Sequence, residues 1–70
     1  MRKPFYKNKL TDNYGVIEGQ VFSSQSSYLQ LRLVNAVGGM IELSHQHENV
    51  TAENLVEVSS EEVQKALVGF

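Results

Sequence analysis

The residues with the clearest potential for chemistry are the two histidines of the chain, His45 and His47. Alternate residues of an extended segment point to the same side, so both imidazoles could reach one metal ion, and Glu48 could add an oxygen ligand. A stable zinc site takes four protein ligands, or three and a water molecule, whereas this chain has no further histidine and no cysteine. We therefore expect two exposed histidines in a polar loop that gain charge below about pH 6.5, with no metal site and no cofactor.

No other group of residues has the composition of a catalytic site. The chain contains no cysteine nucleophile, and Asp12 is its only aspartate. Glu61 and Glu62 form an adjacent acidic pair, but acidic side chains at this position are explained by the start of a helix. Gly38 and Gly39 lie between two predicted strands, whereas a phosphate-binding loop joins a strand to a helix. The sequence thus predicts a protein that is not an enzyme and has no small-molecule substrate.

Basic residues are concentrated at the N-terminus. Four of the six lie within the first ten positions, and all eight acidic residues follow them. Lysines can neutralise phosphates while neighbouring aromatic rings stack on unpaired bases, so this segment supports an alternative function as a nucleic-acid-binding module. The acidic remainder of the chain argues against that function, and lysines also protect an edge strand from pairing with other chains. The residues of this alternative are Arg2, Lys3, Phe5, Tyr6, Lys7 and Lys9.

The alternation of apolar and polar residues predicts five short strands. It is clearest in residues 28–34, where three leucines alternate with other residues. A turn over residues 11–15 ends at Gly15, which permits a positive φ. Gly19, inside a predicted strand, indicates a bend, and a turn that contains Gly38 joins two further strands. The strands are expected near residues 5–10, 16–22, 28–35, 39–44 and 55–58.

The residues after the last strand predict a C-terminal helix near residues 60–68. Ser59, with a glutamate three residues later, has the sequence of a capping box. Val63, Ala66 and Leu67 form an apolar stripe at helical spacing. A helix of two to three turns is marginal alone, so we expect it to pack against the rest of the domain.

Seventy residues predict a single domain over residues 1–70, with a loose basic N-terminus at residues 1–4. We expect a mainly β fold, namely a small five-stranded SH3-like barrel with the C-terminal helix. An α+β arrangement, in which the helix covers one face of an antiparallel sheet, is the alternative. The inward-facing residues would be Ile17, Val21, Leu29, Leu31, Leu33, Ile41, Leu43, Val56 and Val58.

The same alternation leaves four residues pointing outward, namely Phe22, Tyr28, Arg32 and Met40. Aromatic residues, methionine and arginine are enriched at protein interfaces. We therefore expect a non-enzymatic protein-interaction or adaptor module that binds another protein, or a second copy of itself as a homodimer, through this face. No segment has the roughly 20 apolar residues that cross a bilayer, which argues against a membrane partner. The lack of cysteine fits the reducing cytoplasm.

Overall fold

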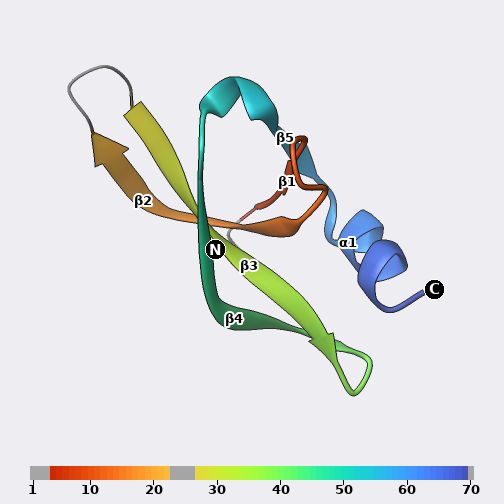
Figure 1. Cartoon of the computed structure of the whole chain (residues 1–70). Helices are drawn as coiled ribbons and strands as arrows, with labels where there is room; N and C mark the ends of the chain where they lie inside the picture. The colour runs from red at the N-terminus through yellow and green to blue at the C-terminus, as the bar shows by residue number, and fades with distance from the viewer. Residues whose placement is uncertain (1–3, 23–26, 70) are drawn as a thin grey trace.

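A computed structural model describes residues 4–22 and 27–69 of the chain (Figure 1). These residues form one antiparallel sheet of five strands in the order β4-β3-β2-β1-β5, followed by a helix. The elements are β1 (Phe5–Asn8), β2 (Tyr14–Phe22), β3 (Ser27–Val37), β4 (Met40–Val50), the 3₁₀ turn η1 (Ala52–Asn54), β5 (Leu55–Val58) and α1 (Ser60–Leu67). The predicted fold class, mainly β with five strands and a C-terminal helix, is confirmed. Within the described ranges, no helix has the length and apolar character needed to cross a membrane.

The sheet does not close into the expected barrel. β4 and β5 are its two outer strands and do not pair with each other. The four-residue β5 pairs along its whole length with β1, and α1 rather than a strand packs against β3 and β4. The structure therefore matches the alternative α+β description, an antiparallel sheet accompanied by one helix.

β4 is longer than the sequence predicts. The polar stretch 44–49, which the sequence predicts as a loop, belongs to this strand. Pairing with β3 continues as far as Val50, which lies opposite Leu29. The long β3 therefore holds the polar stretch extended, although its own composition gives little indication of a strand.

β4 bends at its middle, where the pairing with β3 is irregular. Val34 pairs with Leu43. The next pair is Arg32 with His47, so three residues of β4 lie opposite a single residue of β3. The Ser44 hydroxyl fixes the bend: it donates to a carbonyl of β3 at 2.9 Å and accepts from the amide of residue 46 at 3.1 Å. Figure 1 shows the bend in dark green.

β2 contains a second irregularity, which confirms the bend predicted from Gly19. Ile17 pairs with Leu31, but Gly19 pairs with the preceding residue of β3, so residue 18 is an extra residue in the strand. The bulge places Val16 and Val21 on the same face of β2, opposite Arg32 and Tyr28 of β3. Val16, which alternation places outside, is buried, whereas Val21, farther along the strand, is 37% exposed.

The apolar core is small. Its buried members are Val16, Leu31, Val34, Val50 and Val63. Among the residues predicted to face inward, Leu31 is fully buried, and Ile17, Leu29, Leu33, Ile41 and Val58 are half-buried. Three predicted core residues are exposed instead, namely Val21, Leu43 and Val56. Because the sheet stays open, no opposing strand covers the last two of these.

Gly15 is required by a close approach rather than by the turn. It lies inside β2, and a Cβ atom at this position would overlap the backbone carbonyl oxygen of Arg32 on β3. The positive φ of the turn belongs to Asp12, at 61°. The assignment of Gly15 to the turn was therefore wrong, because alternation carries no information on how closely two backbones pass.

The turn between β3 and β4 is confirmed. Gly38 and Gly39 have φ values of 59° and 80° and are flanked by the pair Val37 and Met40. Two successive positive φ values define a two-residue type I′ hairpin, which glycine adopts without strain. This turn sets the register of the whole β3–β4 hairpin.

The helix begins and ends as predicted, with one difference in its packing. The Ser59 side chain accepts a hydrogen bond from the Glu62 amide at 3.1 Å, which confirms Ser59 as the N-cap. Val63 is completely buried. Ala66 and Leu67, the other members of the predicted stripe, remain exposed.

Candidate functional site

The two histidines do not act together. His45 lies within the bend of β4 and has no register partner in β3, whereas His47 pairs with Arg32 and lies 3.0 Å from Glu18. Across residues 4–22 and 27–69, no three histidine, cysteine or acidic side chains are placed to hold a metal ion. A shared metal would need residues 45 and 47 to point to the same side of β4, and the irregular pairing at the bend interrupts that alternation.

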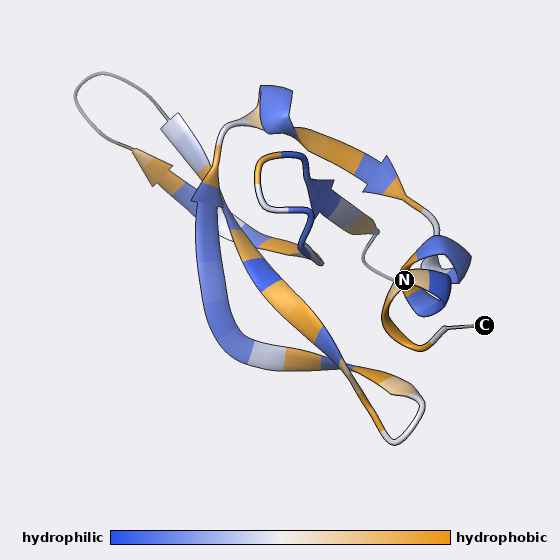
Figure 2. Cartoon of the chain, turned by 45° about the vertical axis from the view of Figure 1, so that its right-hand side comes forward, coloured by the Kyte–Doolittle hydropathy of each residue, from blue (hydrophilic) through white to orange (hydrophobic). Residues whose placement is uncertain are grey.

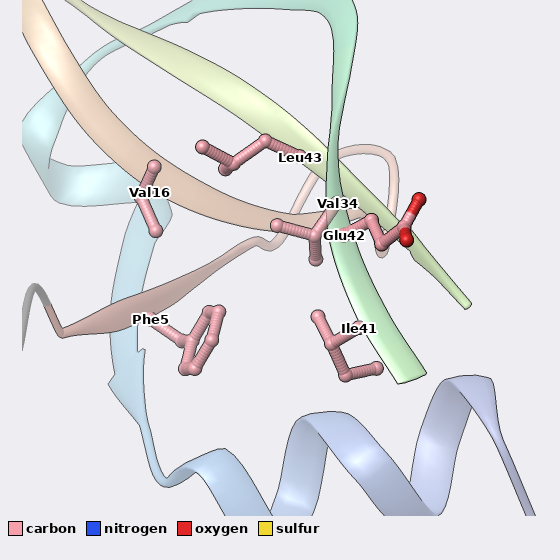
Figure 3. A pocket seen from close by; sticks show the side chains of 6 residues that line it. All are labelled: Phe5, Val16, Val34, Ile41, Glu42 and Leu43. Atoms are coloured by element: carbon pink, nitrogen blue, oxygen red, sulfur yellow. The ribbon is translucent and has the colours of Figure 1, made fainter. Parts of the chain in front are cut away.

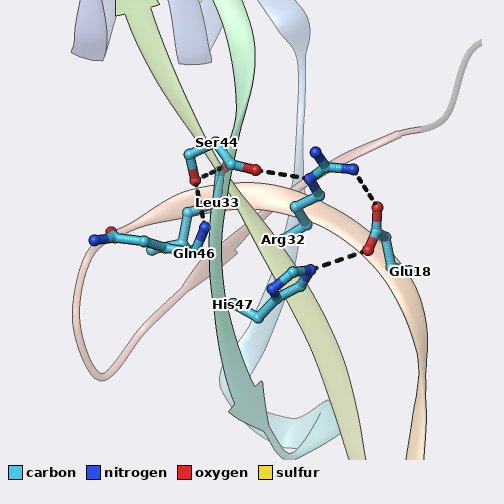
Figure 4. Close-up of polar contacts among 6 residues, drawn as sticks. All are labelled: Glu18, Arg32, Leu33, Ser44, Gln46 and His47. Atoms are coloured by element: carbon cyan, nitrogen blue, oxygen red, sulfur yellow. Dashed lines mark hydrogen bonds and ion pairs between the residues drawn. The ribbon is translucent and has the colours of Figure 1, made fainter.

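His47 instead belongs to an ionic cluster that links three strands (Figure 4). Glu18 of β2 accepts from Arg32 Nη1 of β3 at 2.9 Å and lies 3.0 Å from His47 Nε2 of β4. Arg32 Nε also donates to the carbonyl of Ser44 at 2.7 Å. The hydrogen bond from Arg32, and then that from His47, hold the pKa of Glu18 below its ordinary value of 4.5, against the opposing effect of burial. A lower pKa makes this carboxylate a poorer general base, so the cluster is suited to holding strands together.

A second polar cluster has Glu48 of β4 at its centre. Its carboxylate accepts from Asn8 Nδ2, Thr11 Oγ1 and Asn13 Nδ2, each at 3.0 Å. Asn8 is only 3% exposed, and its own side-chain oxygen accepts from the amide of Leu10. Glu48 therefore fastens the β1–β2 turn to the far strand of the sheet. The sequence contains no signal for this contact, because the partners are more than 30 residues apart.

The four residues predicted to bind a protein do not form one surface. Phe22, 75% exposed, ends β2, and the half-buried Tyr28 starts β3 beside it. Met40, 68% exposed, begins β4 at the hairpin turn, which Figure 1 shows at the opposite end of the molecule. Arg32 lies between them and is occupied by Glu18. Alternation placed all four on one side but could not show how far apart they lie.

The predicted nucleic-acid segment is partly engaged within the domain, and Arg2 and Lys3 lie outside the described residues. Lys7 Nζ lies 3.5 Å from Asp12 and 5.9 Å from the centre of the Tyr14 ring. Tyr6 is half-buried, and Lys9 is exposed. The side chain of Phe5 points into the domain, where it lines a groove (Figure 3).

This groove has a volume of about 210 Å³. Every strand from β1 to β4 contributes to it. The side chains at its border are Phe5, Val16, Val34, Ile41, Glu42 and Leu43. Val16 and Val34 share the face of the sheet that carries Arg32, which the sequence pattern places outside. Ile41 and Leu43 were predicted to face inward, and Figure 3 shows them directed into the groove.

The groove lies beside an apolar projection of the sheet, which we call the hairpin arm (residues 34–43). Leu43, on the groove face of the arm, is 50% exposed, and Val37 and Met40, which pair with each other on its opposite face, are 55% and 68% exposed. Glu42 is the only charged residue of the arm. Figure 2 shows the contrast along β4: the hydrophobic colour follows the arm, and the hydrophilic colour follows the strand beyond the bend.

The described residues form a small antiparallel β domain with a C-terminal helix and an open apolar groove. Comparison with known proteins adds nothing to this description: no family model, curated protein or solved structure matches the chain.

Proposed function

We propose that the chain is a non-enzymatic protein-interaction module whose binding surface is the groove together with the hairpin arm. The observation that carries this proposal is Leu43, which borders the groove and is 50% exposed. Leu43 continues the apolar lining of the groove, and exposed apolar surface of this kind marks an interaction site in soluble proteins, whereas isolated surface leucines do not.

The size of the groove favours a protein partner over a small molecule. Pockets for cofactors and metabolites commonly enclose about 300–1,000 Å³ and carry several polar groups that fix the ligand. The groove measures about 210 Å³, and Glu42 is the only polar residue at its border. It has room for one or two apolar side chains of a partner.

The negative charge of Glu42 and of the domain indicates which partners fit the groove. Glu42 makes no ion pair within the described part of the chain. Glu61 and Glu62 of α1 add negative charge to the domain, and residues 11–70 as a whole carry eight acids against two basic residues. The occupant that fits is a segment of another protein with apolar side chains and at least one lysine or arginine.

Selection from a displayed random-peptide library tests the proposal. The wild-type chain should enrich peptides that combine apolar and basic residues, and these should lose binding to Leu43→Ser. Phe22→Ser is the matched control, because Phe22 is exposed at the other end of the sheet. The proposal is contradicted if no peptide is enriched, or if Phe22→Ser removes binding while Leu43→Ser retains it.

A further inference from the structure

The backbone beside the groove carries unpaired hydrogen-bonding groups. β4 is an outer strand of the sheet, so one of its edges has no paired strand among the described residues. In a two-residue hairpin the pair that closes the turn, here Val37 and Met40, exchanges both hydrogen bonds, and such pairs alternate along the ladder with pairs that exchange none. The N–H and C=O groups of Ile41 and Leu43 therefore point away from β3 toward the open edge.

The same two residues direct their side chains into the groove. An extended peptide laid beside β4 would thus meet two complementary features at once. Its backbone would bond to Ile41 and Leu43, and its alternate side chains would lie next to their side chains at the groove. This combination of a free edge with a pocket for alternate residues is the geometry of strand addition.

The free edge is limited to the hairpin arm. Proteins protect outer strands with prolines, lysines, bulges and bends, and β4 has such a bend directly after Leu43. Residues 40–43 contain neither proline nor lysine. The unprotected stretch is therefore short, and it coincides with the border of the groove.

Glu42 determines which strand fits. Its carboxylate points away from Ile41 and Leu43 in Figure 3, as the pleat of a strand requires. A residue of an added strand directly opposite Glu42 would lie on that same face, where a basic side chain is favourable. A second copy of the arm paired so that Ile41 faces Leu43 would instead place Glu42 against Glu42, where like charges repel.

We infer that the groove binds an extended segment of another protein, with alternating apolar and basic residues, which adds to the arm of β4 as a sixth, antiparallel strand. This inference rests on the proposed function and specifies how the partner binds. The apolar residues of the segment face the groove and hydrogen-bond to Ile41 and Leu43. Its basic residues lie on the other face, opposite Glu42.

A synthetic peptide of alternating lysine and valine, acetyl-Lys-Val-Lys-Val-Lys-Val-Lys-amide, is the probe for this arrangement. Two methylated analogues are the decisive controls, one with N-methyl groups on the valines and one with them on the lysines. Valines in register with Ile41 and Leu43 donate to β4, so the valine analogue should bind at least about tenfold more weakly. The lysine analogue keeps all those donors and should bind as the parent peptide does.

Amide hydrogen exchange gives an independent readout on the full chain. In the free protein the amides of Ile41 and Leu43 should exchange quickly, and those of Met40 and Glu42 slowly, because only the latter bond to β3. Binding of the parent peptide should protect Ile41 and Leu43. Replacing its lysines with glutamates should abolish binding, and Glu42→Lys should restore binding of the glutamate peptide.

The outcomes separate this inference from the proposed function. If the lysine–valine peptide binds at the groove but both methylated analogues bind equally well, strand addition is wrong and the interaction module stands. If that peptide fails while library-selected peptides bind at Leu43, the alternating pattern is wrong. If neither kind of peptide binds, both proposals fail. Dimerisation of the wild-type chain through the arm, measured by sedimentation, would assign the edge to a second copy and overturn the inference.

Discussion

The two halves of β4 differ more than any other neighbouring parts of this molecule. Beyond the bend, His47 and Glu48 are bound by side chains from β1, β2 and the turn between them, and Val50 is 2% exposed. Before the bend, Ile41 and Leu43 face an open groove, and Glu42 makes no ion pair in the described structure. One strand thus contains a segment whose polar side chains His47 and Glu48 are bonded within the domain, and a segment whose apolar side chains face an open groove.

This difference reverses the usual association of polar side chains with function. The polar residues of β4 are the ones that attract attention in the sequence, yet Ser44, His47 and Glu48 use their hydrogen bonds within the domain. No buried side-chain nitrogen or oxygen in the described residues lacks a partner. The apolar residues look like ordinary core residues, yet the fold leaves them uncovered. The proposed site is distinguished by the exposure of its side chains and not by their residue types.

The largest expected effect is that of Gly15, which lies against the backbone of β3, the strand that pairs with both halves of β4. Gly15→Ala should abolish folding, because the added Cβ would overlap the backbone of Arg32 and a domain of this size has only about 3–5 kcal/mol of net stability. Gly19→Ala is the control, since its Cβ would meet only the Gln30 side chain at an ordinary 3.8 Å. Circular dichroism and urea unfolding compare the two. Equal stability of both variants would contradict the close approach of β2 and β3.

Two leucines on neighbouring strands test the contrast in burial. Leu31→Ala should lower the free energy of unfolding by about 2–5 kcal/mol, because Leu31 is fully buried. Leu43→Ala removes the same atoms from a half-exposed position and should cost about 1 kcal/mol or less. Urea unfolding measures both. If Leu43→Ala proved as costly as Leu31→Ala, the groove would be part of the core and not a binding surface.

Two glutamates of β4 test the contrast in polar contacts. Glu48→Ala should cost about 1–3 kcal/mol, since it leaves the buried Asn8 without its carboxylate acceptor and frees the β1–β2 turn. Glu42→Ala should change the free energy of unfolding by no more than about 0.5 kcal/mol, because Glu42 is exposed and unpaired among the described residues. Urea unfolding measures both variants. If Glu42→Ala cost more than Glu48→Ala, Glu42 and not Glu48 would be the glutamate held by contacts within the domain.

The ionic cluster of Glu18, Arg32 and His47 belongs to the half of β4 beyond the bend, and it should make the stability of the domain depend on pH. The pKa of Glu18 in the folded protein is lowered from 4.5, so its stabilising contribution is present above that value and is lost as the pH falls through the lower folded value. Glu18→Gln should therefore weaken the decrease in the urea midpoint between pH 7 and about pH 3. An unchanged pH dependence would show that the cluster contributes nothing to the pairing of the three strands.

The smallest effect is expected at the end of the sheet remote from the arm. Phe22→Ser should alter the free energy of unfolding by no more than about 0.5 kcal/mol, because the ring is 75% exposed. It should also leave binding of the lysine–valine peptide unchanged in a fluorescence titration. Loss of binding in this variant would return the interaction site to the aromatic face that the sequence predicts.

Features that depend on residues within a few positions of one another were predicted correctly. The strand around Leu31, the glycine turn at Gly38 and the Ser59 cap were all confirmed. The assignments that failed involve longer distances. Val16 is buried by the packing of other strands, and the histidine stretch became a strand because β3 pairs with it.

The sequence by itself determined the number of strands and their succession along the chain, the helix and the position of the main turn. These follow from periodicity, capping and backbone preferences. The tertiary structure alone decided that the sheet remains open and that Glu48 is used to hold a distant turn. It also decided that Ile41 and Leu43 border an accessible groove. The physical reason is that exposure depends on what packs against a residue, and at this site the covering strand that a closed barrel would supply is not in place.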